Sequence, residues 1–249
     1  MSQVEYGELA QYYELINEQA VDYDAHTGFL RGVLAGLGPR PTLLDIACGP
    51  GLHARRLQAT GARVVGVDLS LPLLRIAHGR RAAAALLRAD MRALPCGPGF
   101  DGAYCLLHSM NYLTDDRDLT AALRSALLSL RPAGLYVVDF LDYGPPGEWQ
   151  DRWTETYRGD GVVIRAEHDQ RVGDGGRVAI DHHRYTVRDA KGTWEACGQD
   201  RLRVTTSAEM RWRVAGVGFQ VLATRASYPG DRRPGSGEGI IVARRPGAR

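Results

Sequence analysis

The sequence predicts an α/β fold, a doubly wound and mostly parallel seven-stranded sheet with an antiparallel β insert after its fifth strand. Two observations support this prediction. Short apolar runs alternate with helical segments of about ten residues, which is typical of βαβ units. After Tyr143 the pattern changes to strands separated by glycine-rich turns, which is typical of antiparallel hairpins.

Composition narrows the class of protein. The 249 residues are 44% hydrophobic and 24% charged, which suits one soluble domain or a domain with an insertion. No apolar run approaches the roughly 20 residues of a membrane helix, and no signal peptide pattern is visible, so we expect a cytoplasmic protein. The four cysteines lack C-x-x-C spacing, and the net charge is only +2. We therefore expect no metal site, no disulfide and no nucleic-acid partner.

Two helices are expected before the first strand. A short amphipathic helix at residues 8–16 places four apolar or aromatic side chains on one face, at three- to four-residue spacing: Leu9, Tyr12, Tyr13 and Ile16. A second helix is expected near Tyr23 to Leu37. It ends where Gly36-Leu37-Gly38-Pro39 provides a stop signal.

The strands and helices of the α/β part follow in alternation. The first strand, Thr42 to Ala47, is an apolar run typical of a strand that is buried on both faces. Further strands are expected at 63–67, 86–88, 102–107 and 135–140, with helices at 52–60, 71–80 and 119–130 between them. A helix at 207–214 and strands at 219–226 and 240–243 complete the sheet.

The insert is expected to contain four strands, at 153–157, 162–170, 178–187 and 193–204, separated by turn signals. We therefore divide the chain into an α/β domain of residues 1–143 and 207–249 and an insert of residues 144–206. The N-terminal helices are expected to act as a lid on the α/β domain. The insert is expected to cover the pocket of a second substrate.

A glycine-rich turn follows the first expected strand. Residues 49–54, Gly-Pro-Gly-Leu-His-Ala, fit the nucleotide-binding pattern G-x-G-x-x-[G/A] between a strand and a helix. The letters Cys-Gly-Pro-Gly occur a second time at 96–99, where no apolar strand precedes them and no helix follows. We interpret that second copy as a loop.

Acidic residues around the turn discriminate between two cofactors. A dinucleotide would place its pyrophosphate at the helix N-terminus, and Asp45, four residues before Gly49, would repel it. The same carboxylate suits a sulfonium cofactor that carries an ammonium group. Asp90 and Met91, after the third strand, would bind the adenine amine and cover its ring. These positions predict S-adenosyl-L-methionine as the cofactor.

Asp68 lies at the end of the second expected strand. There it could accept hydrogen bonds from both ribose hydroxyls, each worth roughly 1.5–3 kcal/mol to a charged acceptor. The alternative is that Asp68 caps the following helix, a role that Ser70 fills equally well. We therefore assign Asp68 to the ribose.

Taken together, the motifs resemble those of the class I methyltransferases. They occur in the family order, as D-x-A-C-G-x-G at 45–51, V-G-V-D-L-S at 65–70, A-D-M at 89–91, F-D at 100–101 and L-R-P-A-G at 130–134. The chain resembles in particular the amino-sugar N,N-dimethyltransferases of antibiotic biosynthesis, which also carry tyrosines on N-terminal helices and an antiparallel insert after strand five.

The resemblance implies further site residues. Tyr13 and Tyr23 would close the pocket at the methionyl end of the cofactor, while Ala47 departs from the glycine usual at that motif position. The cofactor contacts expected from the motifs and the resemblance together are Tyr13, Tyr23, Asp45, Ala47, Cys48, Gly49, Gly51, His53, Asp68, Leu69, Asp90, Met91 and Leu106.

Methyl transfer from a sulfonium is an in-line displacement. Positioning of the two reactants alone can lower the activation free energy by roughly 7–11 kcal/mol. An amine acceptor makes a base optional, whereas a hydroxyl acceptor requires one. His108, at the end of the fourth strand, is the expected base or acceptor-orienting residue, with Tyr13 as a second catalytic residue. The alternative for His108 is a hydrogen bond to a loop carbonyl. The expected substrate contacts are His108, Asn111, Tyr112, Tyr143 and His183.

The run Asp181-His182-His183 does not predict a metal site, because adjacent side chains on a strand point to opposite faces. One of the two histidines is expected to line the acceptor pocket. Three aromatic residues are expected in the core of the insert rather than on a stacking surface: Trp149, Trp153 and Tyr185.

The sequence therefore predicts S-adenosylmethionine-dependent methyl transfer to a small-molecule acceptor, an amine of an amino sugar or a similar secondary metabolite. An O-methyltransferase, a peptide N-terminal methyltransferase, a dinucleotide-binding oxidoreductase and a non-catalytic domain are the alternatives. The exposed strand edges of the insert are compatible with a homodimer.

Overall fold

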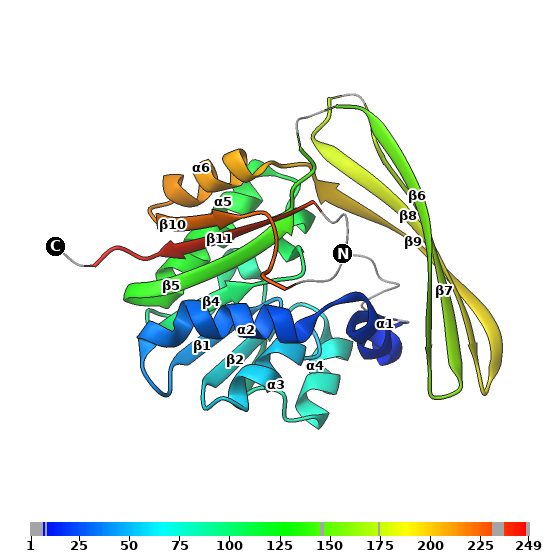
Figure 1. Ribbon diagram of the computed structural model, residues 1–249, viewed down its shortest axis with the longest axis horizontal. Helices are drawn as coiled ribbons and strands as arrows, with labels where there is room; N and C mark the ends of the chain where they lie inside the picture. The colour runs from blue at the N-terminus through cyan, green and yellow to red at the C-terminus, as the bar shows by residue number, and fades with distance from the viewer. Residues whose placement is uncertain (1–6, 8, 145–146, 174, 231–236, 248–249) are drawn as a thin grey trace.

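Two β-sheets organise the residues that the computed structural model describes, which are 7, 9–144, 147–173, 175–230 and 237–247. The larger sheet consists of β1 (Thr42–Ile46), β2 (Arg63–Asp68), β3 (Ala85–Arg88), β4 (Phe100–Cys105), β5 (Leu130–Leu141), β10 (Gln220–Arg225) and β11 (Glu238–Arg244). Their order is β10-β11-β5-β4-β1-β2-β3 (Figure 1). Strands β1 to β5 run parallel, and β11 is antiparallel to both of its neighbours. The predicted mostly parallel seven-stranded sheet is confirmed.

The parallel strands are apolar runs enclosed by helices. Leu43, Leu44 and Ile46 of β1 are fully buried, as a strand covered on both faces requires. Because each crossover returns the chain in the same direction, the carboxyl ends of β1 to β5 meet at one edge of the sheet. Ligands bind at this edge in folds of this kind.

Helices cover both faces of the larger sheet. α2 (Tyr23–Leu34) and α3 (Leu52–Gln58) pack on one face, while α5 (Asp116–Ser129) and α6 (Ser207–Gly216) pack on the other (Figure 1). The helix α4 (Leu71–Gly79) connects β2 to β3, and a 3-10 turn, η3 (Ala35–Leu37), continues α2. All five of these α-helices begin and end within three residues of their predicted bounds.

The N-terminal helix differs from its prediction. A 3-10 turn, η2 (Ala10–Tyr12), leads into α1 (Tyr13–Ala20), so the α-helix begins later and extends further than expected. Glu8, the predicted start, lies outside the described residues. Leu9, Tyr12 and Ile16 pack together as predicted, but they pack against the insert rather than against the α/β core.

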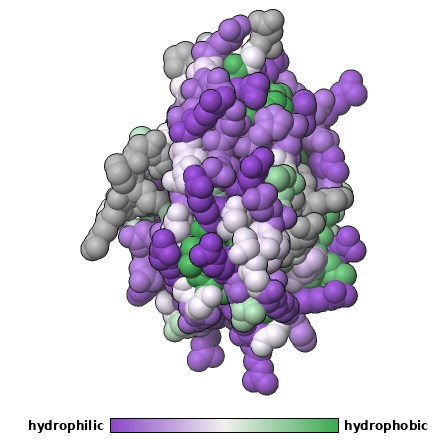
Figure 2. Space-filling view, turned by 90° about the vertical axis from the view of Figure 1, so that its right-hand side faces the viewer, coloured by the Kyte–Doolittle hydropathy of each residue, from purple (hydrophilic) through white to green (hydrophobic). Residues whose placement is uncertain are grey.

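The insert forms a separate antiparallel sheet in the order β6 (Trp149–Gly159), β7 (Val162–Val172), β8 (Val178–Asp189) and β9 (Gly192–Arg203). It curves beside the α/β part, with α1 between them (Figure 1). Burial alternates along the central part of β8, so that His183 and Tyr185 face inward and His182 and Arg184 face solvent. Figure 2 shows that the side of the molecule on which the insert lies is largely hydrophilic.

The remaining observations concern the second Cys-Gly-Pro-Gly segment, the cysteines and the lengths of the helices. Residues 96–99, the second Cys-Gly-Pro-Gly, form neither helix nor strand, as predicted, and all four cysteines are free. Within the described residues, no helix is long and apolar enough to span a membrane.

Candidate active site

A cavity of about 240 Å³ opens at the carboxyl edge of the parallel strands. Its wall is formed mainly by residues at or after the carboxyl ends of β1, β2, β3 and β4, together with tyrosines from α1 and α2. The structure brings together all the predicted cofactor contacts except Gly51: Tyr13, Tyr23, Asp45, Ala47, Cys48, Gly49, His53, Asp68, Leu69, Asp90, Met91 and Leu106.

Asp45 is buried in the cavity wall at the end of β1. Its Oδ2 atom makes no hydrogen bond within normal geometric limits to any described residue, although the nearby Tyr104 hydroxyl favours the charged form of the carboxyl. Burial raises the pKa of the carboxyl well above its usual value, because the surroundings penalise the charged form. A buried carboxylate oxygen without a partner favours a ligand that brings a positive charge and N–H donors.

Asp68 is fixed by the backbone at the end of β2. Its Oδ2 accepts a hydrogen bond from the Gly49 N–H at 2.8 Å, and its Oδ1 accepts one from the Ser70 N–H at 2.7 Å. Burial raises its pKa, and these hydrogen bonds partly oppose the shift. Ser70 caps α4 by accepting from the Leu73 N–H, so the capping role belongs to Ser70, as expected. Each Asp68 oxygen keeps a lone pair for a hydroxyl donor.

The glycine-rich turn uses its small residues for different purposes. Gly49 lies in the cavity wall with φ +52°, whereas Gly51 does not line the cavity. A Cβ on Gly51 would lie 2.5 Å from the Cβ of Ala82, so this glycine lets α3 pack against the segment before β3. Ala47 has φ 59°, a conformation that costs a non-glycine residue roughly 1–2 kcal/mol. This backbone geometry explains why a glycine is usual at its position.

The far end of the cavity carries Asp90 and Met91. Asp90 accepts hydrogen bonds from the Arg92 guanidinium at 2.6 to 3.1 Å, and these lower its pKa. Arg92 also contacts Asp118 at 2.7 Å. The carboxylate is therefore held in a defined orientation beside the methionine side chain.

His53 contributes an uncharged side chain to the wall of the first cavity. Its Nε2 lies 3.3 Å from Nδ1 of His26, and the two rings are stacked. Burial and the neighbouring His26 and Arg56 lower the pKa of His53 well below its usual value. Its role in the wall is therefore that of an uncharged, hydrogen-bonded ring packed against Tyr23.

A second cavity, of about 230 Å³, adjoins the first. Tyr13 and Leu107 line both, so they form the partition between them. The remaining wall comes from α1 and the residues that flank it, from His108 and from the insert, which contributes Glu155, Tyr157, His168 and Tyr185. Glu155 is exposed, and its carboxylate accepts a hydrogen bond from the Tyr157 hydroxyl at 2.8 Å.

His108 lies in a strained turn that a buried acid supports. Leu107 and His108 both have positive φ, 56° and 60°. Asp139 of β5 accepts hydrogen bonds from both of their N–H groups, at 3.0 and 2.7 Å. The Nε2 atom of His108 lies 3.3 Å from Oε1 of the buried Glu238, instead of bonding to a loop carbonyl. Sequence reasoning missed Asp139 and Glu238, because their strands gave no sign of which side chain would reach the turn.

The other predicted substrate contacts lie in different places. Tyr112 lines the first cavity, and its hydroxyl lies 3.4 Å from Asp200. Asn111 is fully buried, exchanges hydrogen bonds with the Leu141 backbone, and donates to the Arg203 carbonyl oxygen. Tyr143 is half-buried and stacks on Trp149. Within the described residues, Asn111, Tyr143 and His183 line neither of these two cavities.

Comparison with known proteins identifies the family. A family model described as a methyltransferase domain matches residues 43–134. The dTDP-3-amino-3,6-dideoxy-alpha-D-glucopyranose N,N-dimethyltransferase of Streptomyces fradiae is 31% identical over 181 residues, which cover 71% of this chain and 70% of that protein. The chain belongs to the class I S-adenosylmethionine-dependent methyltransferases.

Further matches extend over nearly the whole methyltransferase. The dTDP-4-amino-2,3,4,6-tetradeoxy-D-glucose N,N-dimethyltransferase of Saccharopolyspora spinosa is 28% identical over 240 residues, 94% of this chain and 91% of that protein. The crystal structure of Streptomyces venezuelae DesVI matches with a TM-score of 0.76 and 25% identity, covering 91% of this chain and 92% of that one. The enzyme class and the cofactor, S-adenosyl-L-methionine, are thereby confirmed.

The first cavity has the hydrogen-bond acceptors that this cofactor requires. The unpartnered Oδ2 of Asp45 can accept from an ammonium group, and the oriented carboxylate of Asp68 can accept from hydroxyl groups. The apolar part of the wall includes Leu69, Met91 and Leu106. The residues present therefore fit the cofactor.

Proposed function

We propose that this methyltransferase methylates the amino group of an amino sugar, with the second cavity holding the acceptor. One observation carries the proposal: the acceptor cavity meets the cofactor cavity at Tyr13 and Leu107 and presents both His108 and the carboxylate of Glu155. A carboxylate there favours a positively charged amine over a neutral hydroxyl. The relatives from Streptomyces fradiae and Saccharopolyspora spinosa are named as dimethyltransferases of dTDP-linked amino sugars, which supports the same acceptor class.

The cofactor contacts are also part of the proposal. S-adenosylmethionine supplies a methyl group on a positively charged sulfur. Asp45 would hold the ammonium group, Asp68 the ribose hydroxyls, and Asp90 with Met91 the adenine. Tyr13 would exclude water from the partition between the cavities, and Tyr23 would close the first cavity at the methionyl end of the cofactor. The remaining wall residues, including Ala47, Cys48, Gly49, His53, Leu69 and Leu106, would supply backbone and apolar contacts.

His108 would remove or orient the proton of the acceptor. An amine with a pKa near 8 needs only about 1.4 kcal/mol to lose its proton at pH 7, so a weak base at the right place is sufficient. Glu238 holds Nε2 of His108, which leaves Nδ1 for the acceptor. The strained turn at 107–108 and the support from Asp139 fix the ring against the partition.

The acceptor class can be tested directly. The enzyme is incubated with S-adenosylmethionine and matched acceptors, a nucleotide-linked amino sugar and its hydroxyl analogue, and products are identified by mass spectrometry. Methylation of the amine alone supports the proposal. Methylation of the hydroxyl analogue would favour an O-methyltransferase, as some relatives are. The malonyl-[acyl-carrier protein] O-methyltransferase of Pseudescherichia vulneris is 34% identical over 154 residues, but these cover only 60% of that protein.

We also propose that residues 144–206 form a unit that covers the acceptor, and that the protein is cytoplasmic and acts on free small molecules. The near balance of 31 basic and 29 acidic residues supports an acceptor other than nucleic acid. A homodimer formed through the edge strands β6 and β9 is consistent with the sheet order. Light scattering after gel filtration measures the oligomeric state.

A further inference from the structure

The inner face of the insert carries a band of buried polar residues between two apolar clusters. One cluster contains Ile164 and Val187, and the other contains Val172 and Ala179. His168, Asp181 and His183 lie between them on β7 and β8, where His168 and His183 are cross-strand partners. Burying polar side chains in a sheet face costs free energy unless they are paired, so the pairing within this band is informative.

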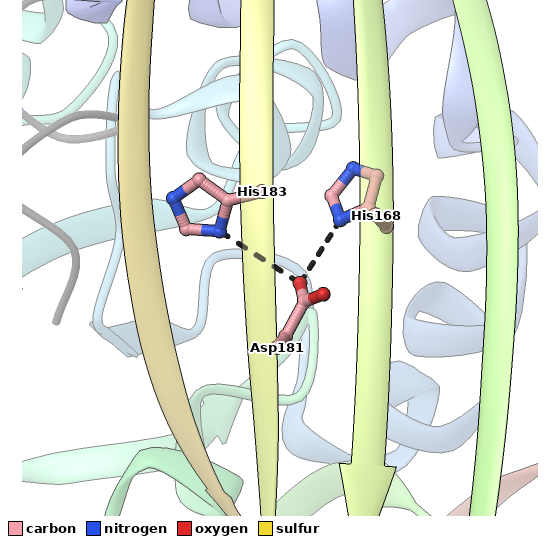
Figure 3. A group of neighbouring side chains, drawn as sticks. All are labelled: His168, Asp181 and His183. Atoms are coloured by element: carbon pink, nitrogen blue, oxygen red, sulfur yellow. Dashed lines mark hydrogen bonds and ion pairs between the residues drawn. The ribbon is translucent and has the colours of Figure 1, made fainter.

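Asp181 lies between the two imidazole rings. Its Oδ2 accepts a hydrogen bond from Nδ1 of His168 at 2.9 Å and lies 3.8 Å from Nδ1 of His183 (Figure 3). Burial of Asp181 raises its pKa, but the interactions with the two histidines outweigh that effect and hold it at about 2. Asp181 is therefore a carboxylate at any physiological pH.

The ring of His168 is fixed on its other sides. It stacks on Trp153 with a centroid separation of 4.6 Å and an interplanar angle of 1°, and it meets Tyr185 edge-on. Trp153 thus serves as a stacking surface for His168 rather than as a member of the insert's apolar clusters, contrary to the sequence prediction.

The two histidines differ in their access to the acceptor cavity. The side chain of His183 is 0% exposed, whereas that of His168 is 10% exposed and lines the cavity that His108 and Tyr13 also line. Since Nδ1 of His168 is bonded to Asp181, Nε2 is the nitrogen left to act on a ligand. A carboxylate that holds Nδ1–H in this way selects the tautomer with a basic Nε2 and stabilises the imidazolium that forms.

We propose that His168, oriented by Asp181, is a second catalytic residue that accepts the proton of the methylated acceptor amine. The inference deepens the proposed function and rests on it. The N–H bond of the secondary ammonium breaks, nitrogen keeps the electron pair, and the proton bonds to the lone pair of Nε2. The amine is then neutral and ready for a second methylation, and the imidazolium is paired with Asp181.

The same three side chains could also be considered as metal ligands, since one atom from each lies within 4.8 Å of the others. The 2.9 Å contact between His168 and Asp181 has the length of a direct hydrogen bond, which places a proton rather than a cation between those atoms. The proton-transfer role is therefore favoured.

Other titratable groups face the same space. From the insert these are Glu155, Tyr157 and Tyr185, and from the opposite side they are His108 and Tyr13. Asp181 and His183 contact the His168 ring within the sheet. Because His108 also serves the first methylation, the informative quantity is the ratio of second to first methylation rather than the total rate.

The test compares His168→Gln, Asp181→Asn and the control His182→Gln, which changes the adjacent histidine on the solvent-facing side of β8. With an amino-sugar acceptor, the first two variants are expected to lower the second methylation at least tenfold and to accumulate the monomethyl product. In His168→Gln the ratio of dimethyl to monomethyl product is expected to be lower than in the wild type at every pH measured. The control matches the wild type.

The inference would be overturned if His168→Gln gave the same ratio of dimethyl to monomethyl product as the wild type. It would also be overturned if a chelator inactivated the wild type and added zinc restored its activity. Nitrogen NMR of the ligand-free enzyme, labelled at histidine, gives a readout independent of the acceptor. His168 is expected as the Nδ1–H tautomer, and Asp181→Asn is expected to lose that preference. An Nε2–H tautomer in the wild type would contradict the inference, whereas failure of the wild type to methylate any amine would refute only the proposed function.

Discussion

Asp68→Asn removes a buried negative charge from the cofactor cavity while keeping the shape of the side chain. The carboxylate accepts from the Gly49 N–H at 2.8 Å and from the Ser70 N–H at 2.7 Å. An amide oxygen can keep one of these bonds, but the amide nitrogen faces a second N–H donor and cannot accept from it. The variant therefore loses both the charge and the orientation on which ribose binding is proposed to depend.

The expected loss of affinity follows from the two proposed ribose bonds. Hydrogen bonds to a charged acceptor contribute about 1.5–3 kcal/mol each, so losing both costs about 3–6 kcal/mol, or roughly 10²–10⁴-fold in affinity. The free energy of unfolding should change less than the free energy of cofactor binding. The unsatisfied backbone N–H costs about 1–3 kcal/mol, and removing a carboxylate whose pKa burial has raised offsets part of that cost.

Calorimetric titration with S-adenosylhomocysteine measures the affinity, and Ser70→Ala is the matched control. Losing this helix cap costs about 0.5–2 kcal/mol of stability and removes no proposed cofactor contact. We expect Asp68→Asn to bind at least a hundredfold more weakly than the wild type and Ser70→Ala to bind normally. An Asp68→Asn affinity within threefold of the wild type, or equal weakening by both variants, would refute the ribose assignment.

Three further substitutions test other parts of the site. Burial raises the pKa of Asp45 above its value in the unfolded chain, so ionisation of Asp45 destabilises the ligand-free fold as the pH rises between the two pKa values. Asp45→Asn should therefore raise the melting temperature at pH 7 and weaken cofactor binding. A lower melting temperature would contradict this prediction. Ala47→Gly should stabilise the protein by up to about 1 kcal/mol in denaturant unfolding by relieving the φ of 59°, and clear destabilisation would show that no strain is present. His108→Gln should reduce kcat roughly 10²-fold without changing cofactor affinity, whereas an unchanged kcat across the pH range would leave His108 with no role in proton transfer.

The residues that line the cavity proposed for the cofactor could be predicted from the sequence because their positions are set locally. Asp45 and Asp68 lie at the ends of β1 and β2, and Gly49 and Asp90 follow β1 and β3 at a short distance. The parallel topology brings these strand ends together whatever the exact register. An apolar run such as β1 is equally local, so the seven-stranded sheet could also be predicted. The bounds of individual elements were less secure, as the late start of α1 at Tyr13 shows.

The acceptor side could not be derived in the same way. His168 and Asp181 meet only because β7 and β8 pair in one register, and a shift of one residue would turn His183 outward and His182 inward. Asp139 supports the turn at 107–108 through a contact that strand periodicity does not encode. The sequence places Asn111 among the acceptor contacts, whereas tertiary packing ties it to Leu141 and Arg203.

The transfer of methyl groups to a sugar amine is tested most directly by mass spectrometry of the enzyme incubated with S-adenosylmethionine and a nucleotide-linked amino sugar. We predict successive monomethyl and dimethyl products, with both methyl groups on nitrogen, and no product from the hydroxyl analogue. A methyl group on oxygen, or no methylation of any amine in the panel while S-adenosylhomocysteine still binds, would contradict the account.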